Sequence, residues 1–156
     1  MTQQYHIAQA NIAHMRAPLD DPLMAGFVER LEEINRLADG SPGFVWRLQT
    51  EDGDNTAIRA FEEDTILINM SVWESLDSLH HYVYRSTHSQ IFARRKEWFQ
   101  VIDTPTSALW WVPAGHIPTI DEAKDRLEML QASGPSPSAF TFLKPFPPPN
   151  GKATPQ

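Results

Sequence analysis

The order in which two hydrophobic periodicities alternate along the chain constrains the fold more than any other feature of this sequence. From Ile66 to Val72 every second residue is large and apolar, which is typical of a strand with one buried face. From Met24 to Ala38 apolar residues recur at steps of three and four, which is typical of a helix with one buried face. Because the two patterns succeed each other several times, the chain is predicted to mix strands and helices in one fold.

Local signals set the approximate bounds of the predicted elements. Asp21 before Pro22 suits a helix start, and capping boxes begin at Thr87 and Thr119. Strands are predicted at 5–12, 44–48, 65–73 and 107–112, and helices at 22–39, from 75, from 87 and from 119. This β-α-β-β-α-β order predicts an α+β fold of the ferredoxin-like split βαβ type, with an extra C-terminal helix and a short edge strand at 139–143.

The chain length and the tryptophans predict how the fold is organised. The 156 residues fit one domain, predicted at 1–146, and the proline-rich segment 147–156 is predicted to be a flexible tail. A ferredoxin-like sheet has helices on one face only, and Trp46, Trp110 and Trp111 place large apolar groups on both sides of the strands. We therefore expect a homodimer in which a second copy covers the open face.

Composition excludes several classes of protein. The formal net charge of −7 disfavours nucleic-acid binding, and the absence of cysteine excludes disulfides, thiolate zinc sites and a cysteine nucleophile. No signal peptide is visible, and no apolar run approaches the roughly 20 residues that a membrane helix needs. No membrane partner is expected, and a cytoplasmic location follows by default.

Several motifs match a known group of proteins. Val72-Trp73-Glu74-Ser75-Leu76 resembles the dimeric α/β-barrel superfamily, which includes antibiotic-biosynthesis monooxygenases and haem-degrading monooxygenases. Longer stretches resemble one branch, the domain of unknown function 3291 family, over nearly the whole chain; they lie at 43–48, 69–74, 94–99, 109–116 and 134–142. The resemblance implies a dimeric α/β barrel, and it implies chemistry only by analogy.

Two histidines are the predicted acid–base residues. His88 lies in a capping box, where the helix dipole favours a neutral ring that can act as a base, and His116 follows a strand end and a Pro-Ala-Gly turn. Each has a plain alternative, a capping or surface residue for His88 and a backbone-bonded loop residue for His116. Asn11 and Asn69 are polar residues on apolar strands, and either could bond a substrate or a neighbouring strand.

A pocket is predicted around the second half of the chain. Arg95 and Trp98 are three residues apart and share a helical face, and His88 lies two turns earlier on it. The strand that carries Asn69 would form the floor, and the walls would be His88, Arg95, Trp98, Trp111 and His116. The alternative pairs Arg95 with Glu74 or Asp103 and makes Trp98 part of the core.

No metal or cofactor is predicted. The acidic residues beside His116 are those that any helix start favours, so they do not indicate a metal site. The haem-degrading branch uses a first-strand asparagine, which Asn11 fits, and a helical histidine, which residues 92–96 lack. The resemblance implies a cofactor-independent monooxygenase-like enzyme acting on a small apolar or aromatic compound, with isomerase and cyclase chemistry left open. The alternative is a non-catalytic ligand-binding or structural dimeric module.

Overall fold

The computed structural model describes residues 4–17, 21–48, 66–85, 94–100 and 105–149. Its centre is an antiparallel sheet in the order β2-β3-β1-β4. The strands are β1 Tyr5–His14, β2 Phe44–Arg47, β3 Ile66–Trp73 and β4 Ser107–Pro113. The described helices are α1 Ala25–Asp39, α2 Leu76–Arg85 and α4 Ile120–Ser133, with 3-10 turns η1 Pro22–Met24 and η2 Arg95–Glu97. This strand order confirms the predicted α+β, ferredoxin-like fold.

The predicted helix starts have a local cause in the structure. The Asp21 carboxylate accepts a hydrogen bond from the backbone N–H of Leu23 at 2.9 Å, and Pro22 occupies the first turn. The Thr119 hydroxyl accepts from the backbone N–H of Glu122 at 3.1 Å and so begins α4. The capping box at Thr87 lies outside the described residues.

The turn between α1 and β2 requires a glycine. Gly43 has a φ of 81°, in the left-handed region that side chains disfavour. A Cβ at this position would also collide with the Ser78 side chain of α2, and the Gly43 carbonyl accepts from the Glu74 N–H at 2.7 Å. Gly43 therefore lets the start of β2 pass close to the start of α2.

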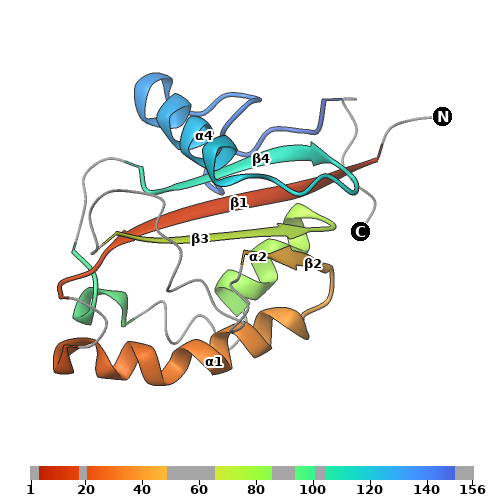
Figure 1. The fold of residues 1–156 in the computed structure, drawn as a ribbon. Helices are drawn as coiled ribbons and strands as arrows, with labels where there is room; N and C mark the ends of the chain where they lie inside the picture. The colour runs from red at the N-terminus through yellow and green to blue at the C-terminus, as the bar shows by residue number, and fades with distance from the viewer. Residues whose placement is uncertain (1–3, 18–20, 49–65, 86–93, 101–104, 150–156) are drawn as a thin grey trace.

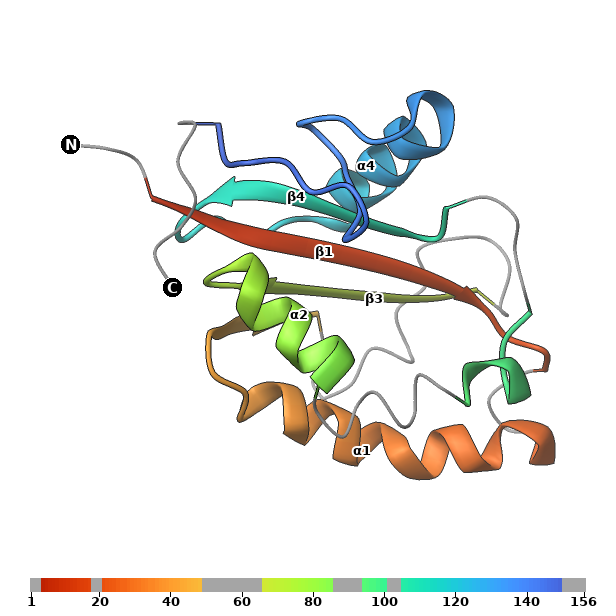
Figure 2. The ribbon, with the colours of Figure 1, turned by 180° about the vertical axis from the view of Figure 1, so that it is seen from behind.

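Each face of the sheet packs against different helices (Figure 1, Figure 2). The even-numbered residues of β1, β3 and β4 form one face, on which α4 lies through Ala123, Leu127 and Leu130. The odd-numbered residues form the other face, where Ile7, Trp73 and Leu109 pack with residues of α1 and α2. The molecule is therefore a sheet between two helical layers.

The position of α4 corrects the reason given for expecting a dimer. The face that was expected to be open carries α4, and its central residues Ile68, Met70 and Trp110 are buried within one chain. The adjacent tryptophans do point to opposite sides, with Trp110 under α4 and Trp111 beside Phe140 and Phe146 on the other side. The homodimer remains a prediction that this face does not require.

The C-terminal segment differs from a regular edge strand. Phe140 pairs with Leu109 through both backbone bonds, at 2.8 and 2.9 Å, as an isolated bridge on the outer edge of β4. The chain then turns, and the Phe146 carbonyl accepts from the Trp111 indole at 2.9 Å. Pro148 is buried between two exposed prolines, so this residue of the predicted tail lies against the domain, and residues 150–156 are outside the described part.

Candidate functional site

A band of polar side chains crosses the odd face of the sheet. Cross-strand register places Arg47, Ser71 and Gln9 in one row, and Asn69, Asn11 and Ser107 in the next. Apolar residues flank the band at both ends, with Ile7 and Trp73 on one side and Met15 and Leu67 on the other. Because the face is otherwise apolar, these polar groups need partners in the protein or in a ligand.

Hydrogen bonds join part of this polar band into a network. The Gln9 amide nitrogen donates to Asn69 Oδ1 and to Ser71 Oγ, each at 2.8 Å. The Trp73 indole N–H, which is fully buried, also donates to Ser71 Oγ at 2.8 Å. Among the described residues, nothing bonds the Asn69 amide nitrogen or the Asn11 side chain.

The charged groups at the margin of the polar band satisfy each other. Arg47 of β2 bonds both carboxylate oxygens of Asp39 at the end of α1, at 2.8 and 3.3 Å. Burial raises the pKa of Tyr82 well above its ordinary value, although the nearby Arg47 charge opposes this, and its hydroxyl donates to the Ile34 carbonyl at 3.3 Å. A phenol in this setting stays protonated at neutral pH.

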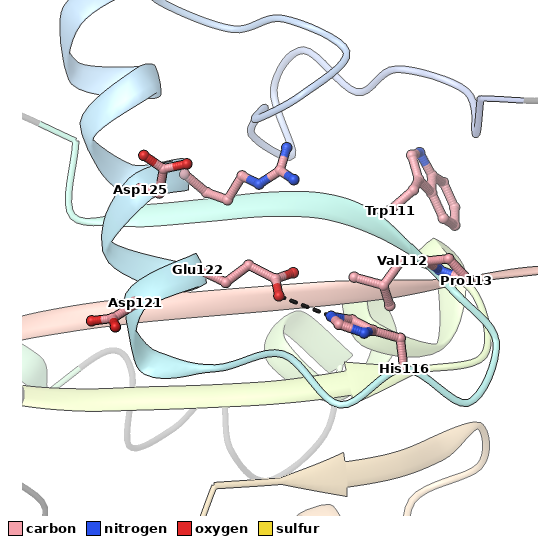
Figure 3. A pocket seen from close by; sticks show the side chains of 8 residues that line it. Trp111, Val112, Pro113, His116, Asp121, Glu122 and Asp125 are labelled. Carbon is pink, nitrogen blue, oxygen red and sulfur yellow. Dashed lines mark hydrogen bonds and ion pairs between the residues drawn. The ribbon is translucent and has the colours of Figure 1, made fainter.

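A pocket of about 670 Å³ lies between β4 and α4 (Figure 3). Its lining residues are Trp111, Val112, Pro113, His116, Asp121, Glu122, Asp125 and Arg126. His116 Nε2 lies 2.8 Å from Glu122 Oε1, and the buried Trp110 indole donates to Glu122 Oε2 at 2.8 Å. Burial alone would raise the pKa of Glu122, but the hydrogen bonds from His116 and Trp110 outweigh it and lower that pKa.

The glutamate of the second capping box thus has an unexpected role. In a capping box the Glu122 side chain would return to the backbone N–H of Thr119. Here both of its oxygens instead accept from Trp110 and His116. The negative charge near the helix start is kept, and the carboxylate in addition ties the loop after β4 to α4.

Comparison with known proteins identifies the family. The sequence profile of a domain of unknown function, DUF3291, matches residues 6–156. The chain belongs to the DUF3291 family. No curated protein matches it.

Two similar solved structures are both of SnoaB, a cofactor-independent oxygenase from Streptomyces nogalater, and one of them is a mutant. Their TM-scores are 0.45 and 0.43, with 13% and 14% sequence identity. Each match covers 72% of this chain and 95% of the SnoaB chain.

The DUF3291 chain does not bring all of its predicted site residues together. Trp111 pairs with Ile7 near one end of β1, whereas the Trp98 carbonyl accepts from the Arg16 N–H beyond the other end. Ile7 and Arg16 are nine residues apart in extended chain, which corresponds to roughly 30 Å. Trp98 is buried in a cluster with Met15, Met24, Phe27 and Leu67. Its position agrees with the alternative in which Trp98 is part of the core.

The remaining predicted residues divide between the two regions. Asn11 and Asn69 face each other across β1 and β3, and Trp111 and His116 line the pocket beside α4. His88 lies outside the described residues, as does the Arg95 side chain. Within the described ranges no group of three or more histidine or acidic side chains is placed to hold a metal ion.

Three contributing residues were missed by sequence reasoning. Gln9 and Ser71 stand two positions from Asn11 and Asn69, so strand alternation already places them on the same face. Glu122 was considered as a capping residue and, together with His116, as a metal ligand, but not as the shared acceptor of His116 and Trp110. No helix in the described ranges has the length and apolarity to cross a bilayer.

Proposed function

We propose that this DUF3291 domain is a cofactor-independent, monooxygenase-like enzyme that holds a small aromatic compound over the polar band. The observation that carries the proposal is the pair Asn11 and Asn69, two facing amides in a polar band that apolar clusters flank at both ends. An apolar surface with few placed polar groups is typical of sites for small organic ligands. The exposed side chain of Asn69 makes this part of the band accessible to a ligand.

The chemistry of the band suits a substrate that becomes an anion. Amide N–H groups from Asn11 and Asn69 can donate to a phenolate or enolate oxygen and stabilise the charge that develops there. The proton would leave to a base, for which His88 stays the prediction. The resulting carbanion can reduce molecular oxygen directly. In the overall reaction, one methylene group and one O₂ give one carbonyl group and one water.

The network behind Asn69 supports the positioning of that amide. Gln9 bonds both Asn69 and Ser71, and Ser71 in turn accepts from the buried Trp73. Groups held by a second set of hydrogen bonds lose less freedom when a ligand binds. Ser71 is 6% exposed, so this support lies beneath the surface that a ligand would touch.

A test uses 1,8-dihydroxy-9-anthrone, which has an acidic methylene between two aromatic rings. We expect protein-dependent oxygen uptake above the spontaneous rate, with the quinone as product. Asn69→Ala and Asn11→Ala should each reduce the protein-dependent rate at least tenfold, in line with the loss of one oxyanion donor. Asn35→Ala, a half-exposed asparagine on α1, is the matched control and should keep the rate.

The outcomes separate the proposal from its alternative. Binding of the anthrone without oxygen uptake would replace the enzyme by a non-catalytic binding module. Equal rates in the wild type and both asparagine variants would remove the polar band from the mechanism. The homodimer is also a proposal, supported by the superfamily resemblance, and a single monomeric species in sedimentation at micromolar concentration would contradict it.

A further inference from the structure

The hydrogen bonds of the polar band have a direction. The Trp73 indole N–H and the Gln9 amide nitrogen both donate to Ser71 Oγ, and the same Gln9 nitrogen donates to Asn69 Oδ1, each at 2.8 Å. Trp73 is fully buried and Ser71 is buried, whereas Asn69 is exposed. The network therefore runs from the buried Trp73 to the surface of the sheet face, and Gln9 joins its two ends.

The same side chains could also bond in the opposite direction. If the Gln9 amide were turned over, its Oε1 would accept from the Ser71 hydroxyl and from the Asn69 nitrogen. The Trp73 indole has no acceptor, so it alone would keep its role. In the structure Gln9 directs its nitrogen inward and uses the Asn69 carbonyl. The Asn69 nitrogen, on the other side of that amide, is then the group that Asn69 directs elsewhere.

The direction of the network decides what can bind beside Asn69. A carbonyl, phenolate or enolate oxygen would accept from the Asn69 nitrogen, whereas a group that can only donate would meet another donor and lose its hydrogen bond. Hydrogen bonds in a chain also polarise one another. Donation from Gln9 to the Asn69 carbonyl should therefore make the N–H groups of Asn69 better donors.

We propose that Gln9 is a positioning residue that fixes the direction of this network and so makes the position beside Asn69 selective for hydrogen-bond acceptors. Gln9 acts on the ligand through Asn69 and takes no part in a reaction step. The role of Gln9 rests on the proposed function for the identity of the bound compound, an aromatic ketone or its enolate. It adds the residue that excludes aromatic compounds with only a donor at that position.

The first experiment tests the direction without a ligand. In each of the two bonds to Ser71 Oγ the hydrogen lies about 2 Å from the oxygen, so the indole hydrogen of Trp73 and one amide hydrogen of Gln9 lie within roughly 4 Å of each other. A nuclear Overhauser effect between these hydrogens is expected in ¹⁵N-labelled protein. Assigned Gln9 amide signals without this effect would show the opposite direction and overturn the proposal.

The second experiment compares two neutral fragments of similar size, indanone, whose carbonyl only accepts, and indole, whose N–H only donates. Titrations followed in ¹H–¹⁵N spectra should show that the wild type binds indanone about tenfold more tightly, with shifts of the Asn69 side-chain amide signals. Equal affinities, a preference for indole, or binding of neither fragment at millimolar concentration would overturn the selectivity.

Variants of Gln9 test whether this residue sets the preference. In Gln9→Glu the carboxylate can only accept, so Asn69 must donate to it and turn its carbonyl outward, and the preference should change to indole. Gln9→Met removes the bonds of both directions and should leave the two fragments with affinities within about threefold of each other. Gln4→Glu, at an exposed glutamine just before β1, adds the same charge and should keep the wild-type preference. An unchanged preference for indanone in Gln9→Glu would refute the role of Gln9.

Oxygen uptake distinguishes the failure of this inference from that of the proposed function. A protein that prefers indanone but does not oxidise the anthrone would lose the proposed enzyme activity and keep the role of Gln9. A protein that oxidises the anthrone equally well in the wild type and in Gln9→Glu would keep the activity and lose the role of Gln9. If both hold, Gln9→Glu should lower kcat for the anthrone more than it raises KM, because the charge on the oxygen develops in the transition state.

Discussion

Replacing Glu122 by alanine removes the acceptor for two donors of very different burial. Trp110 is 0% exposed, so its indole N–H would be left without a partner in the core. An orphaned buried donor costs about 1–3 kcal/mol. The bond to His116 joins side chains that are 44% and 21% exposed, and a pair of that kind contributes less than about 1 kcal/mol.

The free energy of unfolding should therefore fall by about 2–3 kcal/mol at pH 7 in Glu122→Ala. For a chain of this size that corresponds to a drop in melting temperature of about 5–10 °C. Glu122→Gln keeps an acceptor for Trp110 and should lose less than about 1 kcal/mol. Urea denaturation followed by tryptophan fluorescence measures both variants, and Trp110→Phe combined with Glu122→Ala measures the coupling of the two side chains.

The loss of stability in Glu122→Ala should depend on pH in a defined way. The pKa of Glu122 is lowered in the folded state, because the hydrogen bonds from His116 and Trp110 outweigh burial. The carboxylate therefore contributes its stability above the unfolded pKa, and that contribution is lost as the pH falls through the folded pKa. The difference between wild type and Glu122→Ala should shrink below about pH 4.5. Equal stability at pH 7, or a difference that stays constant into acid, would refute this reasoning.

Three further predictions follow from the core, the C-terminus and the absence of a predicted haem ligand. Ser71→Ala should lower the free energy of unfolding by about 1–3 kcal/mol because the buried Trp73 indole loses its acceptor, and an unchanged urea midpoint would argue against that bond. Deleting 150–156 should leave the melting temperature unchanged, whereas deleting 147–156 should lower it because Pro148 is buried, and identical effects would contradict the contact. Haem titration should give no one-to-one Soret band, and an imidazole-ligated spectrum would show the opposite.

Much of the fold follows from local patterns in the sequence. Strand alternation around Ile68 and Met70 and the helical spacing after Pro22 depend on neighbours only a few residues away, and the caps at Asp21 and Thr119 form within a single turn. Such signals can be recognised without knowing the tertiary structure. The same alternation also places Asn11 and Asn69 on strand faces where a polar residue is unusual.

The tertiary structure decided which of these residues meet. Trp98 and Trp111 were expected to share a pocket, yet antiparallel pairing with β1 puts them at opposite ends of that strand. The side of the sheet that α4 covers, and the use of Glu122 by Trp110 and His116, likewise depend on contacts between distant segments. Sequence spacing determines which face of its own element a side chain occupies, but the packing of elements against each other determines what that face touches.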